Sequence, residues 1–299
     1  MISVIIPCYN YGHLIADTIS SVLQQTYTDL EIIVINDGST DNTMSVLETI
    51  SKTDRRVAYY NFENSGLGTS RNRGLEKAKG EFVQFLDADD LLEKRKFDEQ
   101  IKIFNAHQDI DVAYGSVRYF TQNPYDPADR LLTYWGPDKE WMPKFSGPGK
   151  NFLPLAIKGN FSHLSSPLFR RNIVDKVGLF DNSISAVADY HFLLRCVIEN
   201  AVFYYHDTPE TYSLVRWHPD NMSKDPKYMR REEIKMRNKL KPLLQDDAAL
   251  NNLDAIKGLT LQVKGSWKTM FLSGGPFDFL KKGLRSIGLE KIARRFFYK

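Results

Sequence analysis

The feature that most constrains the fold is a regular alternation of short, uninterrupted apolar runs with helix-period stretches over the first 120 residues. The apolar runs predict strands at residues 3–7, 30–35, 57–62, 82–86 and 112–119. The stretches between them predict helices at residues 13–26, 41–50, 68–79 and 94–106. Strands that are apolar along their whole length are typical of a parallel sheet covered by helices on both faces. We therefore expect an α/β fold with a mostly parallel central sheet.

The pattern changes after residue 120. Residues 121–150 contain five prolines with aromatic residues between them, which indicates an irregular insertion at the rim of the sheet. Beyond it, the sequence predicts an extended segment at 165–170, a helix at 188–200, strands at 202–206 and 212–217, and a charged helix at 227–244.

Composition excludes several classes of protein. The formal charge of +3 on 299 residues does not favour a nucleic-acid-coating protein, and two cysteines cannot build a disulfide scaffold. The apolar start ends at Pro7, and no apolar run approaches the roughly 20 residues of a membrane span. The turn after the first strand lacks a glycine-rich phosphate loop, which argues against dinucleotide enzymes and P-loop NTPases. We expect a soluble, cytoplasmic protein.

Carboxylates follow two of the predicted strands, where ligands of open α/β sheets bind. Asp37 follows the second strand, and Asp87, Asp89 and Asp90 follow the fourth. Neighbouring carboxylates repel, and a hard cation such as Mg²⁺ or Mn²⁺ relieves that repulsion. The alternatives are that Asp89 and Asp90 cap the next helix and that Asp37 is an ordinary turn residue.

Four stretches, taken in order, resemble family 2 glycosyltransferases of the GT-A fold. They are residues 4–10 (VIIPCYN), 33–41 (IVINDGSTD), 64–74 (NSGLGTSRNRG) and 85–90 (FLDADD). The resemblance implies a mostly parallel central sheet flanked by helices and a site for a nucleotide-sugar donor. Asn36 departs from it, because many relatives have a second Asp there.

The resemblance also implies site residues. Those that bind the donor are Pro7, Tyr9, Asp37, Arg71, Asp87, Ala88 and Arg216. Asp37 is expected to hydrogen-bond the base, and Asp87 is expected to lie near the ribose. Asp89 and His218 are the implied ligands of the Mn²⁺ or Mg²⁺ cofactor. The alternative for the loop that carries Arg216 and His218 is a solvated loop without a role.

The second half resembles the acceptor side of the family at residues 178–181 (GLFD) and 188–195 (ADYHFLLR). The family's catalytic base falls on Asp189, and Ala188 replaces the usual Glu. The alternative is that Asp189 only caps the helix that follows, although both roles are compatible because a helix N-terminus favours a carboxylate.

These inferences divide the chain into a nucleotide-sugar-binding half (1–120), an acceptor and catalytic-base half (121–225) and a C-terminal helical region (226–299). Residues 264–299 contain nine Lys or Arg and two Asp or Glu among apolar residues, which is typical of a segment lying on an anionic membrane or packing on its own chain.

We expect an inverting, metal-dependent glycosyltransferase that moves a sugar from a nucleotide-diphosphate donor. The resemblance to the family favours a UDP-sugar as that donor. The acceptor would be a glycan or a polyprenyl-linked glycan, with possible peripheral membrane contact through residues 264–299 and no nucleic-acid partner. One alternative is a catalytically retired GT-A scaffold that binds nucleotides or glycans. The other is a sugar-nucleotide pyrophosphorylase.

Overall fold

The computed structural model describes residues 1–133, 140–218 and 226–245, and its strands form two sheets. The large sheet contains β1 (Ile2–Cys8), β2 (Leu30–Asp37), β3 (Val57–Phe62), β4 (Phe82–Phe85), β6 (Val112–Gly115), β8 (Gly147–Pro148), β9 (Leu168–Arg170) and β10 (Val202–His206). The small sheet contains β5 (Leu91–Leu92), β7 (Val117–Phe120) and β11 (Ser213–Arg216).

The large sheet has the strand order β3-β2-β1-β4-β9-β6-β10-β8. Strands β3, β2, β1 and β4 are mutually parallel, as the continuous apolar runs predict. The next strand, β9, runs antiparallel to both of its neighbours, β4 and β6. The carboxyl ends of these four parallel strands therefore lie at one edge of the sheet.

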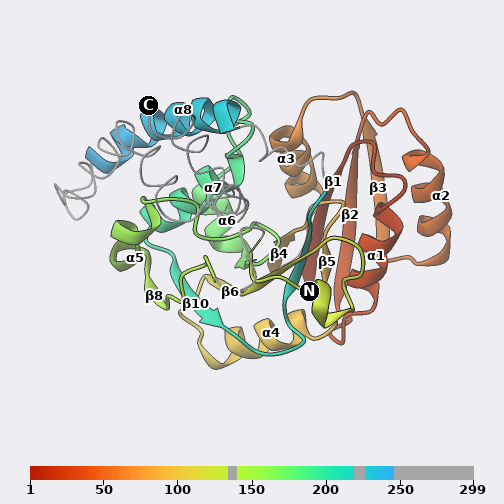
Figure 1. Cartoon of the computed structure of the whole chain (residues 1–299), viewed down its shortest axis with the longest axis horizontal. Helices are drawn as coiled ribbons and strands as arrows, with labels where there is room; N and C mark the ends of the chain where they lie inside the picture. The colour runs from red at the N-terminus through yellow and green to blue at the C-terminus, as the bar shows by residue number, and fades with distance from the viewer. Residues whose placement is uncertain (134–139, 219–225, 246–299) are drawn as a thin grey trace, which may run out of the picture.

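Helices cover both faces of the large sheet (Figure 1). One face is covered by α1 (Ile15–Leu23), α2 (Thr43–Thr53) and α4 (Lys96–Ala106). The other is covered by α3 (Leu67–Lys77), α5 (Gly149–Ala156), α6 (Arg171–Val177) and α7 (Ala188–Ile198), with α8 (Pro226–Gln245) packed on α7. Alternation along β1 divides its side chains between the two apolar clusters: Ile2, Val4 and Ile6 join the first, and Ile5 joins the second.

A lysine is buried in the core between β4 and α4. Lys96 is 1% exposed, and its ammonium donates to the side-chain oxygens of Gln84 at 2.6 Å and Gln100 at 2.9 Å. Burial lowers the pKa of Lys96 well below its usual value. The two glutamine amides point onward, donating to the backbone carbonyls of Ser165 and Ser166 at 3.0 and 3.2 Å.

Most predicted elements are present, with ends displaced by a few residues. The strand predicted at 112–119 is wrong in one respect, since Ser116 divides it into β6 and β7. The two pieces belong to different sheets, because β6 pairs with β10 and β7 pairs with β11. Among the described residues, no helix has the length and hydropathy to cross a bilayer. The basic segment 264–299 lies outside the described residues.

Candidate functional site

The candidate site lies at the carboxyl ends of β2, β1 and β4, which are neighbours in the sheet. Pro7 is buried near the end of β1, and its missing N–H costs no ladder bond. The last bond between β4 and β1 runs from the Leu86 N–H to the Ile5 carbonyl at 3.0 Å, so Pro7 faces beyond the end of that ladder. Tyr9 follows β1 and is 46% exposed at this edge.

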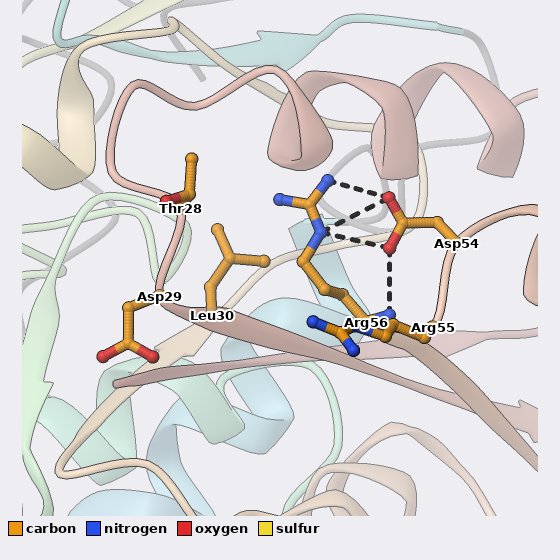
Figure 2. Close-up of a pocket in the computed structure, with 6 residues that line it drawn as sticks. All are labelled: Thr28, Asp29, Leu30, Asp54, Arg55 and Arg56. Atoms are coloured by element: carbon orange, nitrogen blue, oxygen red, sulfur yellow. Dashed lines mark hydrogen bonds and ion pairs between the residues drawn. The ribbon is translucent and has the colours of Figure 1, made fainter.

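The opposite edge of the sheet contains a separate hollow (Figure 2). Its lining residues lie at the start of β2 and just before β2 and β3, and are Thr28, Asp29, Leu30, Asp54, Arg55 and Arg56. The Arg56 guanidinium is paired with the Asp54 carboxylate at 2.8 Å. No residue predicted for the site lines this hollow, so it is distinct from the candidate site.

Asp37 is the best-satisfied carboxylate of the site. It is 4% exposed, and Oδ1 accepts the Ser65 N–H and hydroxyl, both at 3.0 Å, with the Arg73 guanidinium at 3.4 Å. Oδ2 accepts the Gly66 N–H at 2.8 Å. Since a carboxylate oxygen has two lone pairs, Oδ1 is fully used and Oδ2 keeps one acceptor position. Asp37 thus fixes the loop before α3 and still has capacity for one further donor.

Asn36, where many relatives have Asp, is also engaged. Its amide donates to the Asn61 side chain at 2.9 Å, and its oxygen accepts the Ser39 N–H at 3.2 Å. The neutral side chain therefore braces the ends of β2 and β3 together.

Helix α3 contacts both the turn after β4 and the segment that contains Phe180. The Arg71 side chain is 2% exposed, donates to Asp87 Oδ1 at 2.8 Å, and lies 5.4 Å from the ring centroid of Phe180. The next residue of the helix is Asn72. Its side-chain amide donates to the Phe180 carbonyl at 3.0 Å and accepts the Phe180 N–H at 2.8 Å. Phe180 belongs to the GLFD stretch quoted from the sequence. This stretch therefore places an aromatic ring beside the guanidinium that holds Asp87.

The turn after β4 brings the other acidic residues together. The Asp89 carboxylate is 3.0 Å from His218 Nε2, and its backbone carbonyl accepts the Arg216 side chain at 3.1 Å. Asp90 is 2% exposed and accepts the Ser165 hydroxyl at 2.8 Å and the Arg216 N–H at 3.1 Å. Arg216 at the end of β11 and His218, two residues beyond it, therefore both contact this turn. The loop is packed on the site at these two residues, and residues 219–225 lie outside the described part.

Ala88 is buried, and its carbonyl accepts the Thr18 hydroxyl of α1 at 2.8 Å. This bond holds the middle of the turn against the opposite helical layer. The capping alternative for Asp89 and Asp90 is wrong, because α4 begins only at Lys96, after the short strand β5.

Asp189 lies in the first turn of α7, which begins at Ala188 with Val187 as the preceding cap residue. Asp189 is therefore not the capping residue, although its carboxylate benefits from the helix N-terminus. Asn160 donates to Asp189 Oδ2 at 3.4 Å. Burial raises the pKa of Asp189, against the opposing effect of the Arg71 charge. A raised pKa makes this carboxylate a stronger proton acceptor.

The pKa values of Asp87 and Asp89 are shifted in opposite directions, and the pKa of Asp90 is raised. Burial alone would raise the pKa of Asp87, but the Arg71 charge and hydrogen bond outweigh it, so the pKa is lowered. Burial and repulsion from Asp87 raise the pKa of Asp89, against the hydrogen bond from His218. Burial and both neighbouring carboxylates raise the pKa of Asp90 well above its ordinary value.

Mutual repulsion of this kind is what a divalent cation relieves, and the oxygen and imidazole ligands suit Mn²⁺. Among the described residues, Asp87, Asp90 and His163 offer ligand atoms within 4.8 Å of one another. However, Arg71 occupies Asp87 Oδ1, and both Asp90 oxygens already accept protein donors. Asp89 and His218, which the family resemblance implies as metal ligands, form a second pair of candidate ligands 3.0 Å apart at the same turn.

Three polar side chains of the site were not predicted from sequence. Asn160, His163 and Ser165 belong to one irregular segment after α5 and contact Asp189 or Asp90. No motif or spacing marks them, because their contacts arise only when β9 inserts beside β4.

Residues 3–178, more than half of the chain, match the family model described as glycosyl transferase family 2. The chain belongs to glycosyl transferase family 2. Membership of this family favours glycosyl transfer over the pyrophosphorylase alternative.

Relatives of this family 2 glycosyltransferase include bacterial proteins. The uncharacterized glycosyltransferase RT0329 of Rickettsia typhi is 30% identical over 207 residues, which cover 69% of this chain and 62% of that protein. The chain thus spans less than two thirds of the length of this relative.

Two solved structures share the fold. Staphylococcus aureus TarS 1–349 in complex with UDP-GlcNAc has a TM-score of 0.69 and 17% identity, with 90% of this chain and 74% of that chain covered. The mannosyltransferase PcManGT of Pyrobaculum calidifontis, in complex with GDP-Man and Mn²⁺, has a TM-score of 0.57 and 19% identity, with coverage of 99% and 82%. Together with the family match, these likenesses show that the fold is GT-A.

Proposed function

We propose that this glycosyltransferase is inverting and metal-dependent, and that it moves a sugar from a nucleotide-diphosphate donor to a glycan or polyprenyl-linked acceptor. The observation that carries the proposal is that Asp189 and Asp87 lie near enough to interact electrostatically. Asp189 belongs to the predicted acceptor half. Asp87 belongs to the turn after β4, residues 87–90, which we call the donor turn. The charge of Arg71 nevertheless lowers the pKa of both carboxylates. A proton acceptor therefore lies beside the turn that would hold the donor.

In the proposed reaction, Asp189 accepts the proton of an acceptor hydroxyl as its oxygen attacks the anomeric carbon. The sugar–phosphate bond breaks through an oxocarbenium-like state, and its electron pair leaves with the diphosphate. General-base help of this kind is worth roughly 10²–10⁴-fold in rate. Burial raises the pKa of Asp189, which strengthens it for this role. Attack opposite the leaving group inverts the anomeric carbon in a single displacement.

The donor side is proposed to run along the sheet edge from Asp37 past Pro7 and Tyr9 to Asp87. The acceptor position left on Asp37 Oδ2 suits an N–H of a nucleotide base. The exposed ring of Tyr9 provides a flat apolar surface at the same edge, and Asp87 is half-exposed. A UDP-sugar is the proposed donor, and TarS, which shares the fold, has been solved with UDP-GlcNAc.

The proposed metal ligands are Asp89 and His218, which lie 3.0 Å apart. A bound Mn²⁺ or Mg²⁺ would neutralise charge on the leaving diphosphate. Arg216 approaches from the same strand end and braces the turn through its backbone and side chain. The related fold of PcManGT has been solved with Mn²⁺.

The acceptor and the location rest on family resemblance. Glycan or polyprenyl-linked acceptors suit work at the cytoplasmic face of a membrane, and the basic, apolar composition of residues 264–299 supports peripheral contact there. Those residues lie outside the described part, so the support comes from their sequence alone.

The test of the donor site is a thermal-shift panel of UDP, GDP, dTDP and CMP, each with and without Mn²⁺. We expect stabilisation by one nucleotide diphosphate that requires the metal and disappears in Asp89→Ala. Asp109→Ala, an exposed aspartate outside the site, serves as the control. Metal-independent stabilisation that persists in Asp89→Ala would contradict the metal role. No shift with any nucleotide would favour the retired-scaffold alternative.

A further inference from the structure

The segment formed by residues 160–165 reaches both halves of the site. At one end, Asn160 donates to Asp189 Oδ2 at 3.4 Å. At the other end, the Ser165 hydroxyl donates to Asp90 Oδ2 at 2.8 Å. Between them, His163 Nδ1 lies 3.6 Å from the same Asp90 oxygen, and the imidazole is 24% exposed. One short segment thus touches the proposed base and the donor turn.

Buried hydrogen bonds at Ser165 and Ser166 hold the C-terminal end of this segment in place. The Ser165 carbonyl accepts the Gln84 amide at 3.0 Å and the Ser213 hydroxyl at 2.7 Å. The next residue, Ser166, exchanges two hydrogen bonds with the backbone of Gly115, at 2.6 and 3.1 Å. Because these groups are buried, the hydrogen bonds are shielded from water and fix the position of the segment.

The imidazole also acts on the carboxylates electrostatically. His163 lowers the pKa of Asp87 and of Asp189, alongside the larger opposing effect of burial and the lowering by Arg71. A ligand atom of His163 lies within 4.8 Å of an oxygen of Asp87 and of Asp90. His163 is therefore placed among three carboxylates that would otherwise repel one another.

We propose that His163 is a positioning residue of the transfer step, holding the donor turn at Asp87 and Asp90 in register with the base Asp189. Asn160 assists by engaging Asp189 Oδ2. This inference rests on the proposed function, because it assumes that Asp189 is the base. Loss of such a supporting group misplaces the reacting groups without removing any of them, and typically costs about 10- to 100-fold.

The test compares His163→Ala and His163→Asn with the wild type, using hydrolysis of UDP-GlcNAc and of GDP-mannose in the presence of Mn²⁺. We expect His163→Ala to lower kcat about 10- to 100-fold while KM and the nucleotide-induced thermal shift stay within about twofold. His163→Asn retains a hydrogen-bonding group near Asp90 and should restore part of kcat, as should added imidazole in His163→Ala. His107→Ala is the matched control, since His107 is exposed and stacks on Tyr204.

Unchanged kcat in His163→Ala would overturn the proposal. The proposal would also be overturned if kcat fell together with nucleotide affinity and neither His163→Asn nor added imidazole restored it. That pattern is expected of a side chain with a merely structural role. A wild-type protein that neither binds nucleotides nor hydrolyses either donor would instead contradict the proposed function itself.

Discussion

Replacing Asp37 with alanine should release the loop that precedes α3. The carboxylate accepts three hydrogen bonds from Ser65 and Gly66 at 2.8–3.0 Å and a longer one from Arg73. A hydrogen bond to a charged group contributes about 1.5–3 kcal/mol. Ser65 and Gly66 are exposed, so water can replace the lost acceptor, and bonds to one carboxylate are not additive. We therefore expect the free energy of unfolding to fall by about 2–4 kcal/mol.

Urea unfolding followed by circular dichroism measures this loss. Asp37→Asn keeps one acceptor oxygen but turns an NH₂ group toward backbone donors, so we expect an intermediate loss of about 1–2 kcal/mol. Asp109→Ala is exposed and should change stability by no more than about 0.5 kcal/mol. Equal unfolding free energies for Asp37→Ala and Asp109→Ala, at an unchanged m-value, would refute the reasoning.

Two further substitutions test the core beneath the site. Gly74→Ala should destabilise the protein by about 1–3 kcal/mol in the same urea assay, because a Cβ there would clash with Ile5 Cγ2. Gly159→Ala, with open space around it, should be neutral. Equal effects of the two substitutions would contradict the close packing of α3 on β1. Burial lowers the pKa of Lys96 in the folded state. Between that pKa and the unfolded value near 10.4, the unfolded state binds more protons than the folded state. The stability of the wild type should therefore rise with pH relative to that of Lys96→Met. A stability difference that is constant from pH 7 to about 10 would contradict the charge burial.

The donor half was predictable because its signals are local. Short apolar runs define β1, β2 and β4, and the residues of the candidate site follow the ends of these three strands. Asp37 and Asp87 could be placed at one edge because parallel strands present their carboxyl ends together. The quoted motifs then assigned roles that spacing alone would not give.

The acceptor half was less predictable because its contacts are long-range. Strand β9 is three residues long and inserts antiparallel between β4 and β6, and no local pattern specifies such partners. That insertion carries His163 to the carboxylates, whereas its sequence surroundings contain no recognisable constellation. The division of the predicted strand at Ser116 has the same origin, since its two pieces pair in different sheets.

The central claim is that Asp189 removes the acceptor proton beside an intact donor site. Asp189→Asn tests it directly, through hydrolysis of UDP-GlcNAc and GDP-mannose together with the nucleotide thermal shift in Mn²⁺. We predict that kcat falls by about 10²-fold or more while the thermal shift equals that of the wild type. Near-normal turnover in Asp189→Asn would contradict the account.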